Sequence, residues 1–148
     1  MEHKTLVIRI MHPEDLNEVC RIERENFSKP WSEKGFLDSM NQKNTCYLTA
    51  LQDGKVAGYC GMLQVMEEAD ITNVAVDVSF RGRGIGFAML QELMRIGKEC
   101  GVEAFTLEVR QSNRQAISLY ERLGFENCGI RKNFYEKPTE HAVIMWKR

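Results

Sequence analysis

The sequence predicts one α/β domain over residues 1–148, in which helices cover both faces of a mixed β-sheet. Strand-like runs flank both of the later helical segments, giving the order β-α-β-α-β. The earlier strand-like runs connect directly, through an Asp53-Gly54 turn that is typical of a β-hairpin. With 43% hydrophobic and 28% charged residues, a chain of this length can bury a single core, and no repeat or linker divides it.

The first part of the chain is expected to hold one strand and two helices. The run Leu6 to Met11 is the strand candidate. Pro13-Glu14-Asp15 then opens a helix, because proline is accepted in a first turn and acids favour the positive end of a helix dipole. That helix fades near Phe27, and Ser32 is placed to cap a short helix through Met40.

Three strand candidates and a long helix follow. The strands are expected over 45–51, 55–66 and 69–76. Apolar residues then recur at helical spacing, and Gly101 is a residue type favoured just after a helix end. The expected inner face of this helix is Ile85, Met89, Leu93 and Ile96.

The last part of the chain is expected to hold one more helix among three strands. Ser112 or Asn113 caps the helix, and Gln115 stands three residues after Ser112 as in a capping box. The helix runs through Leu123 and stops at Gly124. The strand candidates are 104–109 before this helix, and 125–130 and 142–147 after it.

A turn with three alternating glycines, Gly82, Gly84 and Gly86, joins the 69–76 strand to the long helix. Such a turn brings backbone N–H groups close to a ligand at the positive end of a helix, which suits a pyrophosphate. A Walker P-loop would need lysine and serine or threonine where Phe87 and Ala88 stand, and the dinucleotide fingerprint needs one residue more between its last glycines. The alternative is a tight connection whose glycines serve only close packing.

The pattern Arg-x-x-Gly-x-Gly, filled by Arg81, Gly84 and Gly86, resembles the acyl-CoA-binding signature of the GCN5-related N-acetyltransferases (GNAT). The order of elements along nearly the whole chain is also similar to that superfamily. Five stretches resemble, within it, the bacterial ribosomal-protein alanine N-acetyltransferase (RimI) family. They are Asn-Val-Ala-Val-Asp at 73–77, Leu-Glu-Val-Arg-Gln-Ser-Asn at 107–113, Ala-Ile-Ser-Leu-Tyr-Glu-Arg-Leu-Gly-Phe at 116–125, Lys-Pro-Trp-Ser at 29–32 and Arg-Lys-Asn-Phe-Tyr at 131–135.

The resemblance implies the GNAT fold, with a mostly antiparallel seven-stranded sheet, and acetyl-CoA as co-substrate without a metal. It implies that the backbone at 74–76 runs beside the pantetheine and that the turn at 82–87 wraps the pyrophosphate. The side chains at 74–76 need only be apolar for a core, and capping alone could explain Asn113. The implied cofactor contacts are Val74, Ala75, Val76, Arg81, Gly82, Arg83, Gly84, Ile85, Gly86, Phe87 and Asn113.

Glu108 and Tyr120 are the catalytic residues that the resemblance implies. Strand alternation places Glu108 on the face opposite Leu107 and Val109, where a lone carboxylate usually just meets solvent. The resemblance makes it the general base. Tyr120 shares one helical face with Ala116, Leu119 and Leu123, at i, i+3, i+4 and i+7 spacing, as a core tyrosine would. The resemblance implies that its hydroxyl gives a proton or hydrogen bond to the departing CoA sulfur.

The expected acceptor groove is lined by the aromatic residues Trp31, Phe134 and Tyr135. Trp31 has the alternative of fastening the first two helices onto the core. Glu67 and Asp70 could attract an ammonium group, although a solvated turn explains them as well.

The function expected from the resemblance is transfer of acetyl to the α-amine of an N-terminal alanine, on a small-subunit ribosomal protein. An α-amine has a pKa of about 7.7–8.0 and a lysine of about 10.4, so lysine costs about 3.5 kcal/mol more to deprotonate. A weak carboxylate base therefore suits an N-terminus better. The alternatives are acetylation of lysine or small amines, and a non-catalytic acyl-CoA-binding module. Such a module would need the turn at 81–86 but neither Glu108 nor Tyr120.

Composition argues against nucleic-acid-binding, membrane-spanning, metal-binding and secreted proteins. A net charge of −1 gives no case for direct nucleic-acid binding, and no run approaches the roughly 20 apolar residues of a membrane span. The five scattered cysteines form no Cys-x-x-Cys pair, which favours reduced thiols and a cytoplasmic protein. His3, His12 and His141 lack metal-ligand spacing, and the N-terminus lacks a signal peptide. The oligomeric state is left open.

Overall fold

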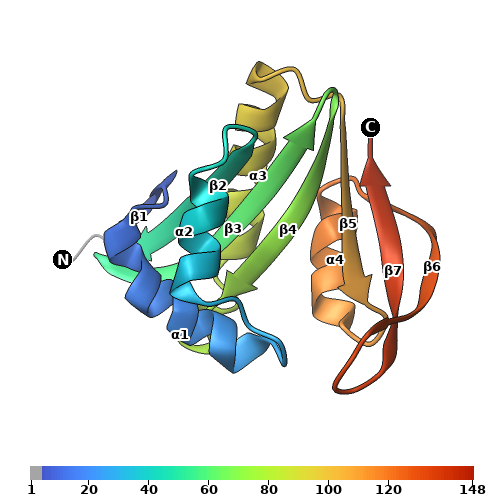
Figure 1. The fold of residues 1–148 in the computed structure, drawn as a ribbon, viewed down its shortest axis with the longest axis horizontal. Helices are drawn as coiled ribbons and strands as arrows, with labels where there is room; N and C mark the ends of the chain where they lie inside the picture. The colour runs from blue at the N-terminus through green and yellow to red at the C-terminus, as the bar shows by residue number, and fades with distance from the viewer. Residues whose placement is uncertain (1–4) are drawn as a thin grey trace.

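A seven-stranded sheet with helices on both faces forms the computed structural model, which describes residues 5–148 (Figure 1). The strand order is β1-β2-β3-β4-β5-β7-β6, and every neighbouring pair is antiparallel except β4 with β5. The predicted mixed, mostly antiparallel sheet is therefore confirmed. His3 lies outside the described residues. No helix within 5–148 has both the length and the apolar character needed to cross a bilayer.

The elements fall close to their expected positions. The largest difference is β6, which continues to Tyr135 because its pairing with β7 resumes after two irregularities and reaches Glu140. The strands are β1 (Leu6–Ile10), β2 (Thr45–Gln52), β3 (Lys55–Val65), β4 (Glu68–Val76), β5 (Ala104–Arg110), β6 (Glu126–Tyr135) and β7 (Glu140–Lys147). The helices are α1 (Leu16–Asn26), α2 (Glu33–Met40), α3 (Ile85–Glu99) and α4 (Arg114–Arg122), with short 3-10 turns at Pro13–Asp15 and Val78–Phe80.

Side chains that the sequence offers as caps begin α2 and α4. Ser32 caps α2 by accepting a hydrogen bond from the Gly35 N–H at 3.1 Å. Helix α4 is capped by Asn113, which accepts from the Ala116 N–H at 3.2 Å. The expected capping box from Ser112 is wrong, because Ser112 precedes the cap and gives its N–H to Glu140.

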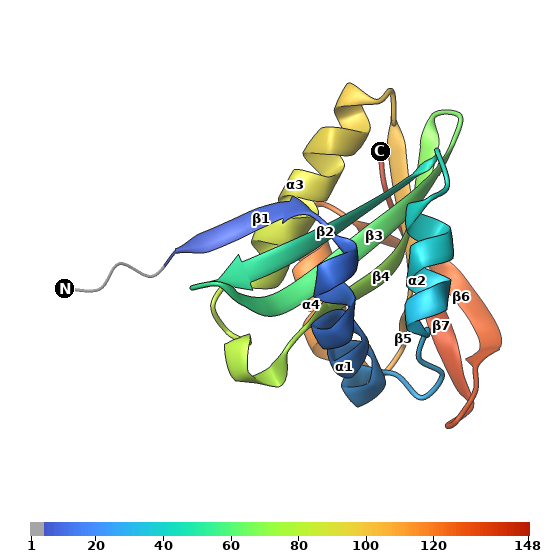
Figure 2. The same ribbon diagram turned by 60° about the vertical axis from the view of Figure 1, so that its left-hand side comes forward.

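Two apolar clusters hold the helices against opposite faces of the sheet (Figure 2). The larger lies under α3 and α4, where Ile85, Met89 and Leu93 are buried and Ile96 is partly buried, as the periodicity predicts. The smaller lies under α1 and α2. It contains Leu16, Val19, Cys20, Ile22 and Phe36, with Met11, Tyr47, Tyr59 and Ala75 beneath them.

The sheet opens in the middle, between β4 and β5. These strands pair only from Glu68–Asp70 to Ala104–Thr106 and then diverge (Figure 1). A bulge in β4 lies at the start of this opening, since Ile71 and Asn73 oppose consecutive residues of β3 and Thr72 is the extra residue. Strand alternation then puts Asn73 on the same face as Ala75, toward α1 and α2.

Candidate active site

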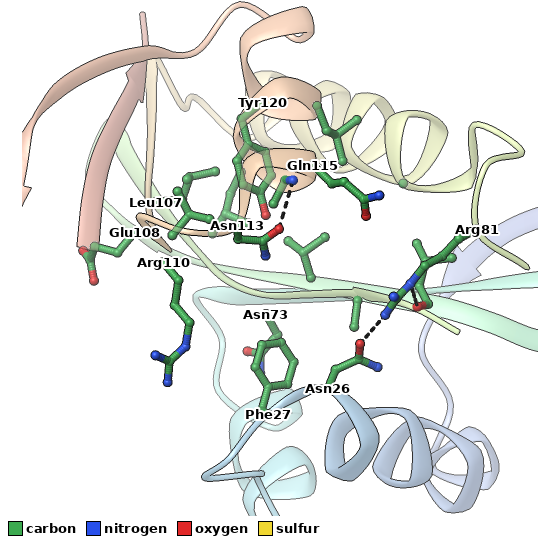
Figure 3. A pocket seen from close by; sticks show the side chains of 18 of the residues that line it. Asn26, Phe27, Asn73, Arg81, Leu107, Glu108, Arg110, Asn113, Gln115 and Tyr120 are labelled. Atoms are coloured by element: carbon green, nitrogen blue, oxygen red, sulfur yellow. Dashed lines mark hydrogen bonds between the residues drawn. The ribbon is translucent and has the colours of Figure 1, made fainter. Parts of the chain in front are cut away.

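A cleft of about 1310 Å³ lies where β4 and β5 separate (Figure 3). Its walls come from the α1–α2 loop, β4, the glycine turn, β5, α4 and the β6–β7 hairpin. Pockets for a single small ligand usually hold about 300–1,000 Å³. The cleft therefore has room for a long ligand or for two ligands that meet.

The glycines of the turn serve two different purposes. Gly82 and Gly84 have φ of +78° and +77°, a left-handed backbone that other residues rarely adopt, and a Cβ at either would meet nothing within 4 Å. Gly86 instead lies buried in α3, where a Cβ would come within 3.2 Å of Leu119. The packing alternative is thus right for Gly86, while Gly82 and Gly84 shape an open loop.

The backbone N–H groups from Gly82 to Phe87 are free to receive a ligand. The first N–H groups of a helix have no carbonyl before them in the helix, and α3 begins at Ile85. Within residues 5–148, none of these six N–H groups has a hydrogen-bond acceptor. They stand at the positive end of a 15-residue helix. This is the donor set and the charge that a pyrophosphate requires, so the turn fits acyl-CoA.

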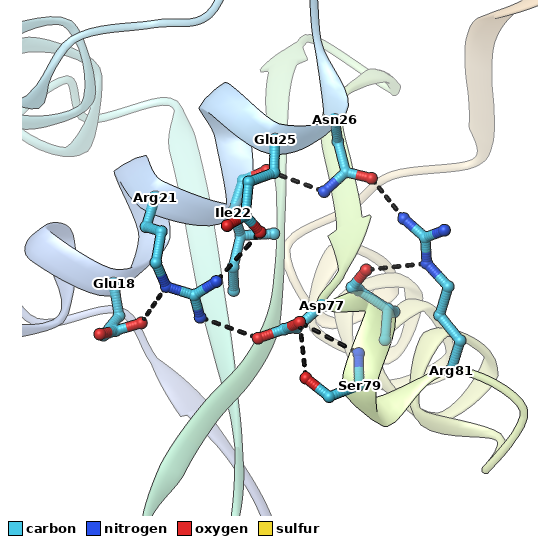
Figure 4. A network of polar contacts seen from close by, with 9 residues as sticks. Glu18, Arg21, Ile22, Glu25, Asn26, Asp77, Ser79 and Arg81 are labelled. Carbon is cyan, nitrogen blue, oxygen red and sulfur yellow. Dashed lines mark hydrogen bonds and ion pairs between the residues drawn. The ribbon is translucent and has the colours of Figure 1, made fainter.

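The side chain of Arg81 is engaged within the protein. Its guanidinium donates to the side-chain oxygen of Asn26 and, at 3.1 Å, to the carbonyl of Val76 (Figure 4). Arg83 lies over the ring of Phe80 at 5.4 Å and is outside the cleft wall. Of these two predicted cofactor contacts, Arg81 thus fastens the turn to α1 and to the end of β4, and Arg83 lies over a ring of its own loop.

Asp77 holds the glycine turn against α1. It is 5% exposed and accepts hydrogen bonds from Arg21 at 2.8 Å and from the Ser79 N–H and hydroxyl (Figure 4). The Arg21 guanidinium, aided by Ser79, holds the pKa of Asp77 below its usual value. Sequence reasoning assigned no role to Asp77, although an aspartate two residues before a serine is a common turn signal.

The predicted pantetheine edge is formed by Val74, Ala75 and Val76. Strand β3 pairs with one side of β4, and after Asp70 the other side faces the cleft without β5. Val74 and Val76 pack on the core under α3, and Ala75 packs on the core under α1 and α2. The side chains are therefore core-like, and the backbone edge is the part available to a ligand, except for the Val76 carbonyl bound by Arg81.

Glu108 lies half-buried on β5, on the face opposite the buried Leu107 and Val109, as strand alternation predicts. Burial raises the pKa of Glu108, the negative charge of Asp70 raises it further, and Arg131 offsets part of this. Within the described chain, neither the Glu108 carboxylate nor the Asp70 carboxylate accepts a hydrogen bond or makes an ion pair. The two line a smaller cavity of about 230 Å³ with Phe134 and Tyr135. Asp70 thus lies on a strand beside this cavity and is still exposed to solvent, while Glu67 lies in an exposed turn as the solvated-turn interpretation expects.

Tyr120 belongs to both the core and the cleft. The residue is 7% exposed, and its ring meets Phe125 edge-on at 6.0 Å. Its hydroxyl points into the cleft and has no hydrogen-bond partner in the part of the chain that the structure describes (Figure 3). Burial raises the pKa of Tyr120 well above its usual value. Such a hydroxyl is better suited to donating a hydrogen bond than to giving up its proton.

The three predicted groove aromatics and Asn113 all line the cleft. Trp31 also packs on Phe36 at 5.2 Å and Tyr47 at 6.4 Å, so it fastens α2 and forms a wall at once. Phe134 and Tyr135 meet edge-on at 5.0 Å. Burial and then the charge of Glu108 raise the pKa of Tyr135 to about 12.

Two further polar residues line the cleft and were missed from the sequence. Asn73 is 6% exposed, and its side-chain oxygen is buried without a hydrogen-bond partner among residues 5–148. Glu23 is 2% exposed and accepts from the Trp31 N–H and the Tyr59 hydroxyl. No local pattern marks either residue, because each is defined by what the fold brings beside it.

The comparisons with known proteins agree with this geometry. The model of the acetyltransferase (GNAT) family matches residues 16–125, and the chain belongs to that family. A relative from Escherichia coli K12, ribosomal protein bS18-alanine N-acetyltransferase, is 38% identical over 135 residues, covering 88% of this chain and 89% of the relative. The protein of that name from Salmonella typhimurium is 38% identical over 141 residues, covering 93% and 94%.

Solved structures give the same result. The crystal structure of the ribosomal-protein-S18-alanine N-acetyltransferase from Escherichia coli superposes with a TM-score of 0.88 at 35% identity, covering 97% of this chain and 93% of that one. A ribosomal-protein-alanine N-acetyltransferase from Brucella melitensis gives 0.83 at 26% identity, covering 95% and 98%. The fold predicted from the sequence is that of this family.

Proposed function

We propose that this chain transfers acetyl from acetyl-CoA to the α-amine of an N-terminal alanine, on a ribosomal protein. One observation carries the proposal: a single cleft joins the free N–H groups of the glycine turn to the Glu108 carboxylate and the Tyr120 hydroxyl. A cofactor held at the turn and an amine near Glu108 would meet in that cleft. The names of the relatives from Escherichia coli and Salmonella supply the class of acceptor.

Acetyl-CoA supplies the acetyl group as a thioester, and the chain supplies the binding and proton-handling groups. The N–H groups at 82–87 bind the pyrophosphate, and the β4 edge at 74–76 binds the pantetheine. Glu108 takes the proton of the incoming ammonium, and its raised pKa brings it nearer to that of an α-amine. Tyr120 donates a hydrogen bond to the sulfur as it leaves.

The choice of an α-amine follows from the size of the proton-transfer task. An α-amine near pKa 7.7–8.0 is partly neutral at pH 7, whereas lysine costs about 3.5 kcal/mol more to deprotonate. Glu108 lacks a cationic partner within ion-pair distance in residues 5–148, so its carboxylate is free to accept the proton. A ribosomal-protein acceptor places the reaction in the cytoplasm and needs no direct nucleic-acid binding.

The test is an acetyl-CoA assay with matched peptides at pH 7. One peptide has a free N-terminal alanine and no lysine, and the other has a blocked N-terminus and one internal lysine. We expect the free N-terminus to react several hundred-fold faster, the ratio given by about 3.5 kcal/mol. Equal rates would replace the N-terminal assignment with lysine or small-amine acetylation. Tight acetyl-CoA binding without transfer to any amine would indicate a binding module.

A further inference from the structure

The α1–α2 wall of the cleft is anchored by one buried carboxylate. Glu23 lies near the end of α1 and is 2% exposed, yet it lines the cleft. One oxygen accepts from the backbone N–H of Trp31 at 3.0 Å, and the other accepts from the Tyr59 hydroxyl at 2.5 Å. Both oxygens are thus fixed, one by the loop and one by the sheet beneath it.

We propose that Glu23 is a positioning residue for the acceptor, because it fixes the α1–α2 loop at Trp31 and so sets one wall of the acceptor groove. The nature of the acceptor rests on the proposed function. Glu23 acts through Trp31, whose ring lies on Phe36 and Tyr47 and lines the cleft.

Glu23 is a buried carboxylate that no nearby cation in the described chain compensates. Burying a carboxylate is costly unless a cation or good donors compensate it. Among the residues that the structure describes, no lysine, arginine or histidine lies within ion-pair distance of Glu23. Among residues 5–148, its only donors are two neutral groups, the backbone N–H of Trp31 and the hydroxyl of Tyr59. A carboxylate meets this pair of donors because it offers two acceptor oxygens and no hydrogen.

The polar contacts between the α1–α2 loop and Glu136 are exposed to solvent. Lys29 pairs with Glu136 across the mouth of the cleft, and the Ser28 hydroxyl donates to the Glu136 carbonyl at 3.3 Å. Exposed ion pairs contribute little, because water and salt screen them. The bond from the backbone N–H of Trp31 to Glu23 is part-buried and better shielded from solvent, so it is the polar contact best placed to hold the loop.

The test separates geometry from charge and from general core damage. Glu23→Ala removes both bonds, and Glu23→Asp keeps the charge but is one methylene too short to meet both donors. We expect both variants to raise the peptide KM about tenfold or more, the effect of losing a hydrogen bond to a charged group, while the acetyl-CoA KM stays near wild type. Glu23→Gln keeps the length and should restore the peptide KM, since its amide can accept from Trp31 and donate to Tyr59.

Tyr59→Phe is the matched control. It deletes the second donor but leaves the bond between Glu23 and Trp31, so it should lower the melting temperature without raising the peptide KM. If Tyr59→Phe raised the peptide KM as much as Glu23→Asp, the effect would be general core damage and the proposal would be overturned. It would also be overturned if Glu23→Gln raised the peptide KM as much as Glu23→Asp, because a side chain of the right length that can still bind both partners would then not restore the acceptor site.

Fluorescence gives a readout that needs no acceptor. Trp31 and Trp146 are the two tryptophans, so Trp146→Phe leaves Trp31 as the single reporter. In that background, Glu23→Asp should make Trp31 more accessible to acrylamide quenching, and Glu23→Gln should not. Unchanged quenching in folded Glu23→Asp would overturn the positioning role. If Glu23→Asp increases quenching while the wild-type chain fails to acetylate N-terminal peptides, the proposed function is rejected and the positioning role is kept.

Discussion

Gly84→Asp tests the cofactor turn, because the structure separates its effect on folding from its effect on binding. At φ +77°, an L-residue costs about 1–2 kcal/mol. A negative charge at the N-terminus of α3 regains about 0.3–1 kcal/mol from the helix dipole. A Cβ at Gly84 would meet nothing within 4 Å, so no packing is lost. The variant should stay folded, with a melting temperature lowered by about 2–4 °C for each kcal/mol lost.

Binding of acetyl-CoA should be lost in the same variant. Two like charges about 4 Å apart repel by about 4 kcal/mol at an effective dielectric constant of about 20. Solvent screening and side-chain rotation reduce this for an exposed turn, so we expect affinity to fall by about 10²-fold. Calorimetric titration with acetyl-CoA measures the affinity, and thermal unfolding of the same sample measures stability.

Gly84→Asn is the control for charge. Asparagine has nearly the same size and tolerance of the left-handed backbone, so its backbone cost should match. It lacks the gain of about 0.3–1 kcal/mol from the helix dipole, so it should be slightly less stable than Gly84→Asp, while its acetyl-CoA affinity should stay near wild type. Wild-type affinity in folded Gly84→Asp would refute the assignment of the turn to the pyrophosphate. An equal loss in both variants would mean that backbone strain, and not charge, disturbs the site.

Three predictions concern the reacting groups. Tyr120→Phe should lower kcat on the order of 10²-fold with little change in acetyl-CoA affinity; near-normal single-turnover rates would return Tyr120 to a packing role. Glu108→Gln should lose activity that rising pH partly restores, since more amine then arrives neutral; a pH-independent loss would contradict the role of base. Because the charge of Asp70 helps to raise the pKa of Glu108, Asp70→Asn should lower the pKa of Glu108. The acid limb of the plot of kcat/KM against pH should then move to lower pH. An acid limb that does not move would show that Asp70 does not influence the group that titrates there.

The features that the sequence predicts correctly depend on neighbours along the chain. The hairpin at Asp53-Gly54, the cap at Ser32 and the inner face of α3 each follow from residue types a few positions apart. The glycine turn is found for the same reason. The choice between Ser112 and Asn113 as a cap could not be made locally, because Glu140 from a distant strand binds the Ser112 N–H.

The features that were missed depend on residues far apart in the chain. The bulge at Thr72 arises from the register of β3 against β4, and it turns Asn73 toward the acceptor side. The place of Asp70 beside Glu108 requires β4 and β5 to pair for three residues and then separate. The residue pattern of neither strand shows where the pairing of β4 with β5 ends. The walls of the cleft could therefore not be predicted in detail.

Helix α1 joins the two halves of the site. Arg21 and Asn26 bind the segment that carries the glycine turn, through Asp77 and Arg81 (Figure 4). Between them in sequence, Glu23 binds the acceptor loop at Trp31. The proposed cofactor side and the proposed acceptor side are otherwise built from different elements on opposite faces of an opened sheet. Because one helix is bonded to both segments, the packing of α1 on the sheet helps to set the distance between them across the opening of β4 and β5.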